Sequence, residues 1–197
     1  MLTLQSLPGT ALNDYLDDIA RLRIEVFRAF PYLYDGSIDY EKHYLQTYLN
    51  SAQSLIVLAW DQQRIVGAST ALPLADAAPE MQQPFIRAGY ALSDIFYCGE
   101  SVLLPQYRGQ GVGVAFFARR EAHARQSGNF RFSSFCAVER PDDHPAKPAD
   151  YTSLAAFWQR RGYVKQPSLV ASFVWKDTDQ TTESTKSLSF WLKDLTL

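Results

Sequence analysis

Apolar residues along the chain fall into segments of two kinds, separated by short polar turns. Runs rich in Val, Ile, Leu and aromatic residues predict strands, and longer runs with apolar residues every three or four positions predict helices. Strands are expected at residues 2–7, 55–60, 64–72, 95–104, 130–138, 169–175 and 186–195. Helices are expected at residues 14–28, 40–50, 80–87, 112–126 and 151–161.

Residues near the helix ends support these boundaries. Asn13 or Asp14 is expected to cap the first helix and Asp39 the second, because their side chains accept hydrogen bonds from free amide groups. Gly162 is expected to end the last helix. In the helix at 112–126, a stripe of small residues predicts close packing on a sheet: Ala115, Ala118 and Ala122.

The order of the main elements is β-α-α-β-β-β-α-β-α-β-β. This order predicts an α+β, or mixed α/β, fold in which helices cover both faces of one sheet. With 197 residues, of which 47% are hydrophobic, the chain is long enough to bury a substantial core. No internal repeat or linker divides it, so residues 1–197 are expected to form one domain.

Charge and cysteine content argue against several functional classes. A formal net charge of −2 gives no reason to expect nucleic acid or an anionic membrane as a partner. No segment approaches the roughly 20 apolar residues of a membrane span, and residues 1–5 do not resemble a signal peptide. Cys98 and Cys136 lie in apolar runs, which favours free buried thiols and a cytoplasmic location. No metal is expected, because no Cys/His cluster has the spacing of metal ligands.

The most informative motif is a glycine-rich turn between a predicted strand and a predicted helix. Its alternating glycines, Gly109, Gly111 and Gly113, let the backbone approach a bulky group closely. The turn lies where the helix begins, and the first amide groups of a helix have no intrahelical partner. Free N–H groups and the positive helix end form an anion site that suits a pyrophosphate. The turn therefore indicates a phosphorylated cofactor.

Glycine spacing narrows the choice of cofactor. A dinucleotide fingerprint would need glycine or alanine at Val114 or Phe116, and a P-loop motif is absent. The sequence instead contains Arg-x-x-Gly-x-Gly, at Arg108, Gly111 and Gly113. This motif resembles the acyl-CoA-binding signature of the GNAT acetyltransferase superfamily. A nucleotide-binding domain is an alternative that the glycine spacing disfavours.

Two further features extend this resemblance over nearly the whole chain. The segment from Phe157 to Tyr163 is similar to the end of the fourth GNAT helix, where aromatic-Tyr-x-Lys/Arg-x-Gly-Phe/Tyr is common. The order of elements is also similar to that of GNAT proteins. The resemblance implies a central, mostly antiparallel sheet of six or seven strands with helices on both faces. Its fourth and fifth strands would be parallel and splayed.

The resemblance also implies acetyl-CoA, or another acyl-CoA, as the co-substrate. The acceptor would be an amine, on a small molecule or a protein, that attacks the thioester directly. In the family, the glycine turn holds the pyrophosphate and the end of the fourth strand pairs with the pantetheine arm. The matching positions are Val102, Leu103, Leu104, Arg108, Gly109, Gln110, Gly111, Val112 and Gly113, with Trp158 as a wall of the pantetheine channel.

A general base must take a proton from the amine before it attacks. Glu100 is the first candidate, because it lies inside an apolar strand near the expected splay and burial raises the pKa of a carboxylate. The alternative is a structural carboxylate that pairs with an arginine. Glu139, at the end of the following strand, is the second candidate base.

One departure from the family concerns the general acid. The usual acid is a tyrosine four residues before the helix-ending glycine, and Trp158 occupies that position. An indole N–H does not protonate a thiolate. Either Tyr151 replaces it, or the thiolate leaves unprotonated, since a free thiol has a pKa of about 8.5. The missing tyrosine also leaves open a non-catalytic acyl-CoA sensor.

The acceptor pocket is expected in the loop at 27–36, as in the family. Phe30, Tyr32 and Tyr34 would give it an aromatic wall for apolar or cationic groups, unless the loop folds onto the core instead. Aromatic residues of the last two strands are expected to pair across a homodimer: Phe173, Trp175, Phe190 and Trp191.

Overall fold

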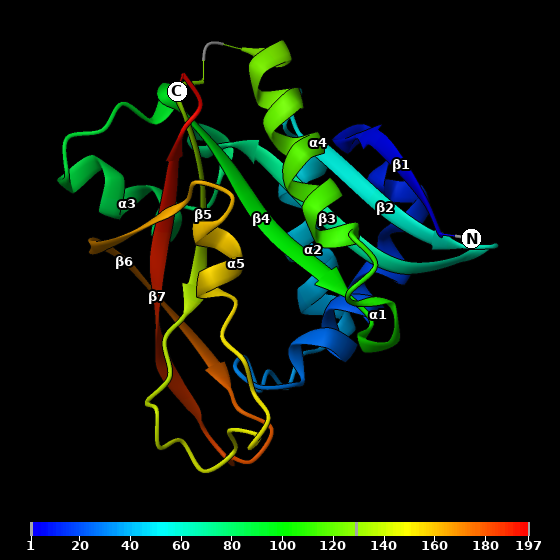
Figure 1. Cartoon of the computed structure of the whole chain (residues 1–197), viewed down its shortest axis with the longest axis vertical. Helices are drawn as coiled ribbons and strands as arrows, with labels where there is room; N and C mark the ends of the chain where they lie inside the picture. Colours follow the sequence, from blue (N-terminus) through cyan, green and yellow to red (C-terminus); the bar gives the residue numbers. More distant parts are fainter. Residues whose placement is uncertain (1, 129, 197) are drawn as a thin grey trace.

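The computed structural model describes residues 2–128 and 130–196, and its strands form one seven-stranded sheet (Figure 1). The strand order is β1-β2-β3-β4-β5-β7-β6, and every neighbouring pair is antiparallel except β4 and β5. The strands are β1 Leu2–Pro8, β2 Leu55–Asp61, β3 Arg64–Pro73, β4 Ile95–Leu103, β5 Phe132–Val138, β6 Val164–Lys176 and β7 Glu183–Asp194. The predicted mixed fold and its single parallel pair are confirmed.

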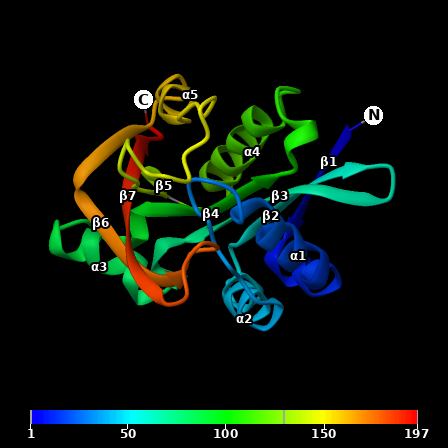
Figure 2. The ribbon, with the colours of Figure 1, turned by 90° about the horizontal axis from the view of Figure 1, so that it is seen from below.

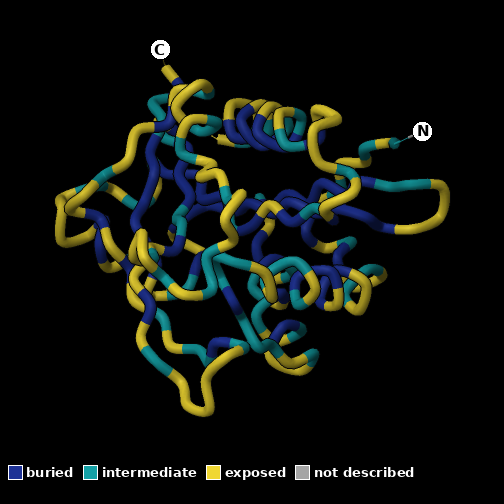
Figure 3. Tube along the Cα trace, turned by 60° about the horizontal axis from the view of Figure 1, so that its bottom comes forward, coloured by how far each residue is buried: buried dark blue, intermediate teal, exposed yellow. Residues whose placement is uncertain are grey.

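Helices cover both faces of this sheet, as predicted (Figure 2). One face carries α1 (Leu16–Phe27), α2 (Ile38–Leu49) and α3 (Pro79–Arg87), and the other carries α4 (Val112–Ser127) and α5 (Ala155–Gln159). Buried apolar side chains form two clusters, and the larger one includes successive residues of β2 and residues of α1, α2 and α4, so it extends over both faces of the sheet. Figure 3 shows the buried positions concentrated along the central strands and the inward sides of the helices.

β4 and β5 pair only where they begin. Ile95–Tyr97 pair with Phe132–Ser134, and beyond these residues the two strands diverge (Figure 1). β4 also bulges, because the register against β3 shifts where Gly99 and Glu100 lie opposite Thr70. The backbone of β4 beyond Tyr97 therefore has no strand partner on the β5 side. The predicted splay of the fourth and fifth strands is confirmed.

The helix starts differ from the expected caps. A 3-10 helix, Gly9–Tyr15, precedes α1, so Asn13 and Asp14 lie inside it and do not cap α1. The cap of α2 is Ser37, whose Oγ accepts a hydrogen bond from an amide of the first turn, and Asp39 lies within that turn. Acidic residues within a first turn still favour the positive helix end. Acidic residues in a first turn are therefore easily mistaken for N-caps when only the sequence is known.

The alanine stripe predicted to face the sheet from α4 is wrong. Ala118 and Ala122 are exposed. α4 packs on β2, β3 and β4, and the helical period places the alanine stripe on the opposite face from the residues that make this contact. Larger side chains dominate the buried face of α4: Val112, Phe116, Phe117, Arg120, Glu121 and Ala124.

The last three elements also differ from the prediction in their bounds. α5 has 5 residues, and Gly162, at a φ of 84°, ends that segment as expected. β6 begins at Val164 and β7 at Glu183, both earlier than the apolar pattern indicates. The reason is that these strands pair with each other as a long hairpin, which extends them beyond their apolar residues.

Two of the four aromatic residues expected at a homodimer interface lie in the core. Phe190 is 0% exposed and Trp191 5%. They pack within their own chain, so a homodimer through these strands stays a prediction that rests on Phe173 and Trp175, which are half-buried.

Candidate functional site

A cavity of 1190 Å³ lies where β4 and β5 diverge. The loop after α1, the two diverging strands, the glycine turn with α4, and α5 all contribute to its lining. One cavity therefore contacts the region predicted for the cofactor and the region predicted for the acceptor.

The glycine turn between β4 and α4 has the backbone conformation that its glycines permit. Gly109 and Gly111 have φ values of 76° and 81°, and Gly111 is the N-cap of α4. Among the described residues, no backbone or side-chain acceptor is found for the amides of Gly109 to Val114. These amides, at the positive end of a helix of 16 residues, are donors for an anion.

Most residues predicted to bind the cofactor line the cavity: Leu103, Arg108, Gly109, Gly111, Val112, Gly113 and Trp158. Val102, Leu104 and Gln110 are not part of its lining. Val102 pairs with β3, and the Leu104 amide donates to the Val66 carbonyl at 3.0 Å. The Gln110 side chain donates back to the carbonyl of Gln106 at 3.3 Å.

α5 contributes an aromatic wall to the cavity. The indole of Trp158 packs against the rings of Phe135 in β5 and Trp191 in β7, with centroids 5.0 Å apart in both pairs. The neighbouring Phe157 lies near Gly113, where an added Cβ would be 3.4 Å from its ring. Aromatic packing thus fixes α5 beside the start of α4.

Glu100 lies in a buried group of charged and phenolic side chains between β4, α1 and α2. Its Oε2 lies 2.6 Å from Nη1 of Arg23 and accepts hydrogen bonds from Tyr44 and Tyr48 at 3.3 and 3.4 Å. Arg23 also pairs with Glu41. Oε1 of Glu100 is buried without a hydrogen-bond partner among the described residues, and Glu100 lines the cavity. Glu100 therefore both pairs with a buried arginine and lines the cavity.

The partners of Glu100 keep their protons at neutral pH. Burial by itself lowers the pKa of Arg23, but the charges of Glu100 and Glu41 outweigh it and raise that pKa above its ordinary value. Burial raises the pKa of the Tyr44 and Tyr48 phenols. Three donors therefore hold Oε2 of Glu100 in one position.

The two other catalytic candidates also line the cavity. Glu139 follows β5, and its Oε1 lies 2.6 Å from Nζ of Lys165 in β6, with both side chains partly exposed. Tyr151 packs edge to face on Phe30, with ring centroids 4.7 Å apart. Burial raises the pKa of Tyr151, so its phenol stays protonated at neutral pH.

The aromatic residues predicted for the acceptor pocket do not all reach the cavity. Phe30 and Tyr32 line it, and the Tyr32 ring lies 4.5 Å from that of Phe27. Tyr34 is outside the lining and packs against Trp175 instead, with ring centroids 6.3 Å apart. The loop after α1 therefore contributes two of the three predicted rings.

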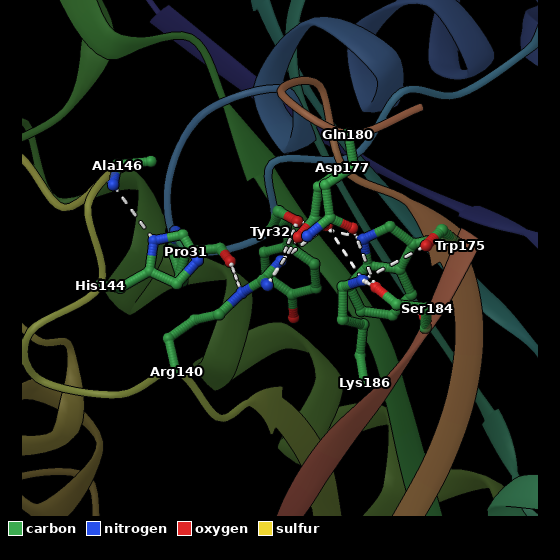
Figure 4. A network of polar contacts seen from close by, with 10 residues as sticks. All are labelled: Pro31, Tyr32, Arg140, His144, Ala146, Trp175, Asp177, Gln180, Ser184 and Lys186. Carbon is green, nitrogen blue, oxygen red and sulfur yellow. Dashed lines mark hydrogen bonds and ion pairs between the residues drawn. The ribbon is translucent and has the colours of Figure 1, made fainter. Parts of the chain in front are cut away.

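A buried ion-pair group, which we call the Arg140 clasp (Arg140, Asp177 and Lys186), holds the loop after α1 (Figure 4). Arg140 donates to both carboxylate oxygens of Asp177, at 2.8 and 2.9 Å, and to the carbonyls of Pro31 and Tyr32, at 2.8 Å each. Nζ of Lys186 lies 3.3 Å from the Asp177 carboxylate. Burial alone raises the pKa of Asp177, but Arg140 and Lys186 outweigh it and hold that pKa below its ordinary value.

Three arginines of this region were not predicted from the sequence: Arg23, Arg120 and Arg140. Arg23 and Arg120 lie on buried helix faces, four residues after Ile19 and Phe116 respectively. That helical spacing was a usable signal, because it places each arginine on the same face as a core residue. Arg140 follows β5 in a polar loop and shows no such pattern.

Cys98 and Cys136 are free thiols, as predicted. Within residues 2–128 and 130–196, no three His, Cys, Asp or Glu side chains gather closely enough to hold a metal ion. No helix in the same ranges has the length and apolar character that crossing a bilayer requires.

The sequence matches no protein-family model and no curated protein, whereas solved structures match over nearly the full length. A ribosomal-protein-alanine N-acetyltransferase from Brucella melitensis has a TM-score of 0.62 and 11% identity, covering 98% of this chain and 99% of that one. NAA60 from Arabidopsis thaliana, in complex with a bisubstrate analogue, has a TM-score of 0.62 and 10% identity, covering 98% and 99%. A proposed acetyltransferase from Salmonella typhimurium, with its cofactor acetyl-CoA, has a TM-score of 0.59 and 8% identity, covering 98% and 94%.

At these identities the comparison concerns the backbone arrangement alone. The matches extend over nearly the whole of both chains, and further GNAT-family acetyltransferases match in the same way. The order of elements, the mixed sheet and the diverging parallel strands agree with that comparison. The chain therefore has the fold of the GNAT acetyltransferases.

Proposed function

We propose that this protein is an acyltransferase that moves an acetyl group from acetyl-CoA to an amine, on a small molecule or a protein. The observation that carries the proposal is the cavity between β4 and β5. Unpartnered amide donors line it at the glycine turn, and a buried carboxylate and aromatic rings line it elsewhere. The Salmonella structure with acetyl-CoA and the Arabidopsis structure with a bisubstrate analogue support the proposal by analogy of fold.

Coenzyme A suits the groups present. The amides of Gly109 to Val114 and the Arg108 guanidinium would bind the diphosphate. The pantetheine arm has amides that need partners, and the edge of β4 beyond Tyr97 has no strand partner on the β5 side. Trp158 would cover the arm. Bound in this way, the co-substrate supplies an activated acyl group.

In the proposed reaction, Glu100 takes a proton from the acceptor amine, directly or through a water molecule. The amine nitrogen then bonds to the thioester carbonyl carbon, and the carbon–sulfur bond breaks with its electron pair on sulfur. Glu100 releases its first proton through water and takes the surplus proton that the nitrogen loses as the amide forms. A backbone amide at the β4 bulge would polarise the carbonyl. Glu139, paired with Lys165, is the second candidate base.

Protonation of the departing sulfur has two candidate routes. Tyr151, a protonated phenol on the cavity wall, is a candidate donor. Trp158 occupies the position of the family's tyrosine and has no acidic proton to give. Alternatively, sulfur leaves as the thiolate, since a free thiol has a pKa of about 8.5.

The acceptor would enter from the loop after α1. Phe30, Tyr32 and Tyr151 line the cavity there, and aromatic rings bind apolar and cationic groups. The expected acceptor has an amine that can reach Glu100 and a substituent that packs on aromatic rings. The free thiols Cys98 and Cys136 support a reducing compartment, and we place the protein in the cytoplasm.

Turnover with acetyl-CoA and a panel of amines tests the proposal. Free thiol should appear only when both substrates are present, and its rate should saturate with each. Tight binding of coenzyme A without turnover on any amine would favour the alternative, an acyl-CoA sensor, to which Trp158 at the usual acid position points. Preference for a dinucleotide over coenzyme A would contradict both.

A further inference from the structure

Arg120 is a cation buried in the cavity wall without an anionic partner. The residue lies on α4 and is 2% exposed. Its Nη1 donates to the Glu100 carbonyl at 3.2 Å, and its guanidinium lies 4.7 Å from the centroid of the Phe117 ring. In the part of the chain that the structure describes, Arg120 forms no ion pair, and its Nε is buried without a hydrogen-bond partner.

The carboxylates nearest to Arg120 have other partners. The side chain of Glu100 pairs with Arg23 of α1, on the opposite face of the sheet from α4. Glu121 pairs with Lys193 at 2.7 Å and accepts a hydrogen bond from Tyr163 at 3.2 Å. Burying a guanidinium without an anion is costly. The position of Arg120 therefore suits an anion that forms or binds in the cavity.

The rise along α4 and the length of β4 show how far Arg120 lies from the glycine turn. α4 rises about 12 Å over the eight residues from Val112 to Arg120, and β4 spans about 10 Å from Leu103 to Glu100. The hydrogen bond to the Glu100 carbonyl therefore sets the guanidinium well beyond the proposed diphosphate site, beside the β4 bulge. If Glu100 is the base, the thioester must lie at this depth.

We propose that Arg120 stabilises the thiolate of coenzyme A as the acyl group leaves. This inference rests on the proposed function. When the amine nitrogen bonds to the carbonyl carbon, the electron pair of the carbon–sulfur bond stays on sulfur, and the proton of the amine passes to Glu100. A fixed cation in a buried site stabilises such a charge more strongly than water does. No proton donor is then needed where Trp158 replaces the tyrosine.

The test measures binding rather than turnover, using coenzyme A and desulfo-coenzyme A over a range of pH. Arg120 should lower the pKa of the bound thiol, so coenzyme A should gain affinity as the pH rises through that lowered pKa, and the gain should be complete above about 8.5. A decrease of one pKa unit corresponds to about a tenfold gain. Desulfo-coenzyme A lacks the thiol but keeps the phosphates. We therefore use the ratio of the affinity for coenzyme A to the affinity for desulfo-coenzyme A, in which the effects of protein and phosphate titration cancel. We expect the ratio to rise at least about tenfold in the wild type.

Variants assign that rise to one residue. Arg120→Met should abolish the rise in the ratio, and Arg120→Lys should retain part of it. Arg119→Met is the matched control, because the neighbouring Arg119 donates to Ser6 of β1 at 2.8 Å and is not part of the cavity lining. This control should behave as the wild type does. A merely structural Arg120 would change the affinity for both ligands equally.

Each outcome decides the inference. A flat ratio in the wild type, or an unchanged rise in Arg120→Met, would overturn it while leaving the proposed function intact. Failure of both ligands to bind would contradict the proposed function and the inference together. If Arg120→Met does not fold, the wild-type and Arg120→Lys curves decide alone, because a rise of equal size in both would show that guanidinium placement is irrelevant.

Discussion

Glu100 meets both alternatives that its sequence position leaves open. Its carboxylate pairs with Arg23 of α1, as a structural carboxylate would, and Glu100 also lines the cavity, with one carboxylate oxygen unpartnered among the described residues. The pairing does not exclude a role as a base, because a fixed carboxylate is oriented for proton transfer. Glu41 offers a comparison that can separate the two roles. Glu41 and Glu100 both pair with Arg23, but Glu41 does not line the cavity.

Replacing each of these carboxylates separates catalysis from folding. We expect Glu100→Gln to lower kcat by about 10²–10⁴, the usual contribution of a general base, with little change in the affinity for acetyl-CoA. Glu41→Gln removes an equivalent partner of Arg23 and should change the melting temperature but not kcat. Steady-state kinetics and thermal unfolding provide the measurements. An equal loss of kcat in both variants would assign Glu100 a structural role only.

Two glycines with the same backbone conformation offer a second comparison at this scale. Gly111 and Gly89 have φ values of 81° and 80°, and an added Cβ would meet nothing within 4 Å at either one. Alanine at either position should cost about 1–2 kcal/mol of stability. Gly111→Ala alone should also weaken coenzyme A binding, by about tenfold, since it distorts the amides of the turn. Calorimetric titration and thermal unfolding check both parts, and equal binding in the two variants would contradict the site.

Among the elements, the loop after α1 depends on contacts with distant strands. The Arg140 clasp joins the end of β5 and the β6–β7 hairpin to the carbonyls of Pro31 and Tyr32. Two of the residues proposed for the acceptor pocket, Phe30 and Tyr32, lie in or beside this anchored segment. The clasp therefore sets the shape of the acceptor side without itself being part of the reaction.

Removing the guanidinium of the clasp should affect the acceptor and not the cofactor. Arg140→Ala leaves the buried Asp177 carboxylate without its main partner, which costs about 3–5 kcal/mol. The KM for the acceptor should rise, and the affinity for acetyl-CoA should not change. Arg28→Ala is the control, because among the described residues the Arg28 side chain pairs only with Asp35, on the surface of the same loop. A similar rise in KM in this control would contradict the proposed positioning.

The clasp also predicts a pH dependence of stability. Because the folded pKa of Asp177 lies below its unfolded value of about 3.9, the ionised carboxylate stabilises the fold above that pH. This contribution should be lost as the pH falls through the folded pKa. The stability difference between the wild type and Asp177→Asn should therefore shrink in acid, as measured by denaturant unfolding at several pH values. An unchanged difference would exclude Asp177 as a source of acid sensitivity.

At the scale of the whole molecule, the sheet is continuous except where β4 and β5 diverge. They share only three paired positions, so the β1–β4 half and the β5–β7 half are joined weakly there by main-chain hydrogen bonds. Helix side chains and the cavity occupy the remaining space. A ligand that lies between the strands would add the cross-links that the sheet lacks.

Binding of acetyl-CoA should accordingly stabilise the whole fold. At a concentration of 100 times Kd, the gain is about 2.7 kcal/mol, which raises Tm by about 5–10 °C in a protein of this size. Amides that exchange by global unfolding should slow throughout the fold. Amides that exchange by local opening should slow most at the end of β4, the glycine turn and α5, and least in β1 and β2. Thermal unfolding and exchange measurements check this, and local protection confined to β1 and β2 would place the ligand elsewhere.

Much of the fold could be predicted from local patterns, while the errors have two causes. Strand periodicity and glycine turns located the elements, since these depend on neighbouring residues. The alanine stripe of α4 was wrong because packing on β2, β3 and β4 decides which face of the helix is buried, and that face is the opposite one. The caps of α1 and α2 were misassigned because several polar residues near a helix start compete for one position.

The candidate site also has a part that local sequence predicts and a part that depends on contacts between distant residues. The glycine turn is local, so its positive φ values and free amides follow from Arg108 to Gly113 themselves. The partners of Glu100, the burial of Arg120 and the Arg140 clasp join residues that are far apart in the chain. By itself, the sequence determined the order of the elements and the glycine turn at the start of α4. Only the tertiary structure decided which charges are buried together, because that depends on how the diverging strands bring α1, α4 and the loop after β5 around one cavity.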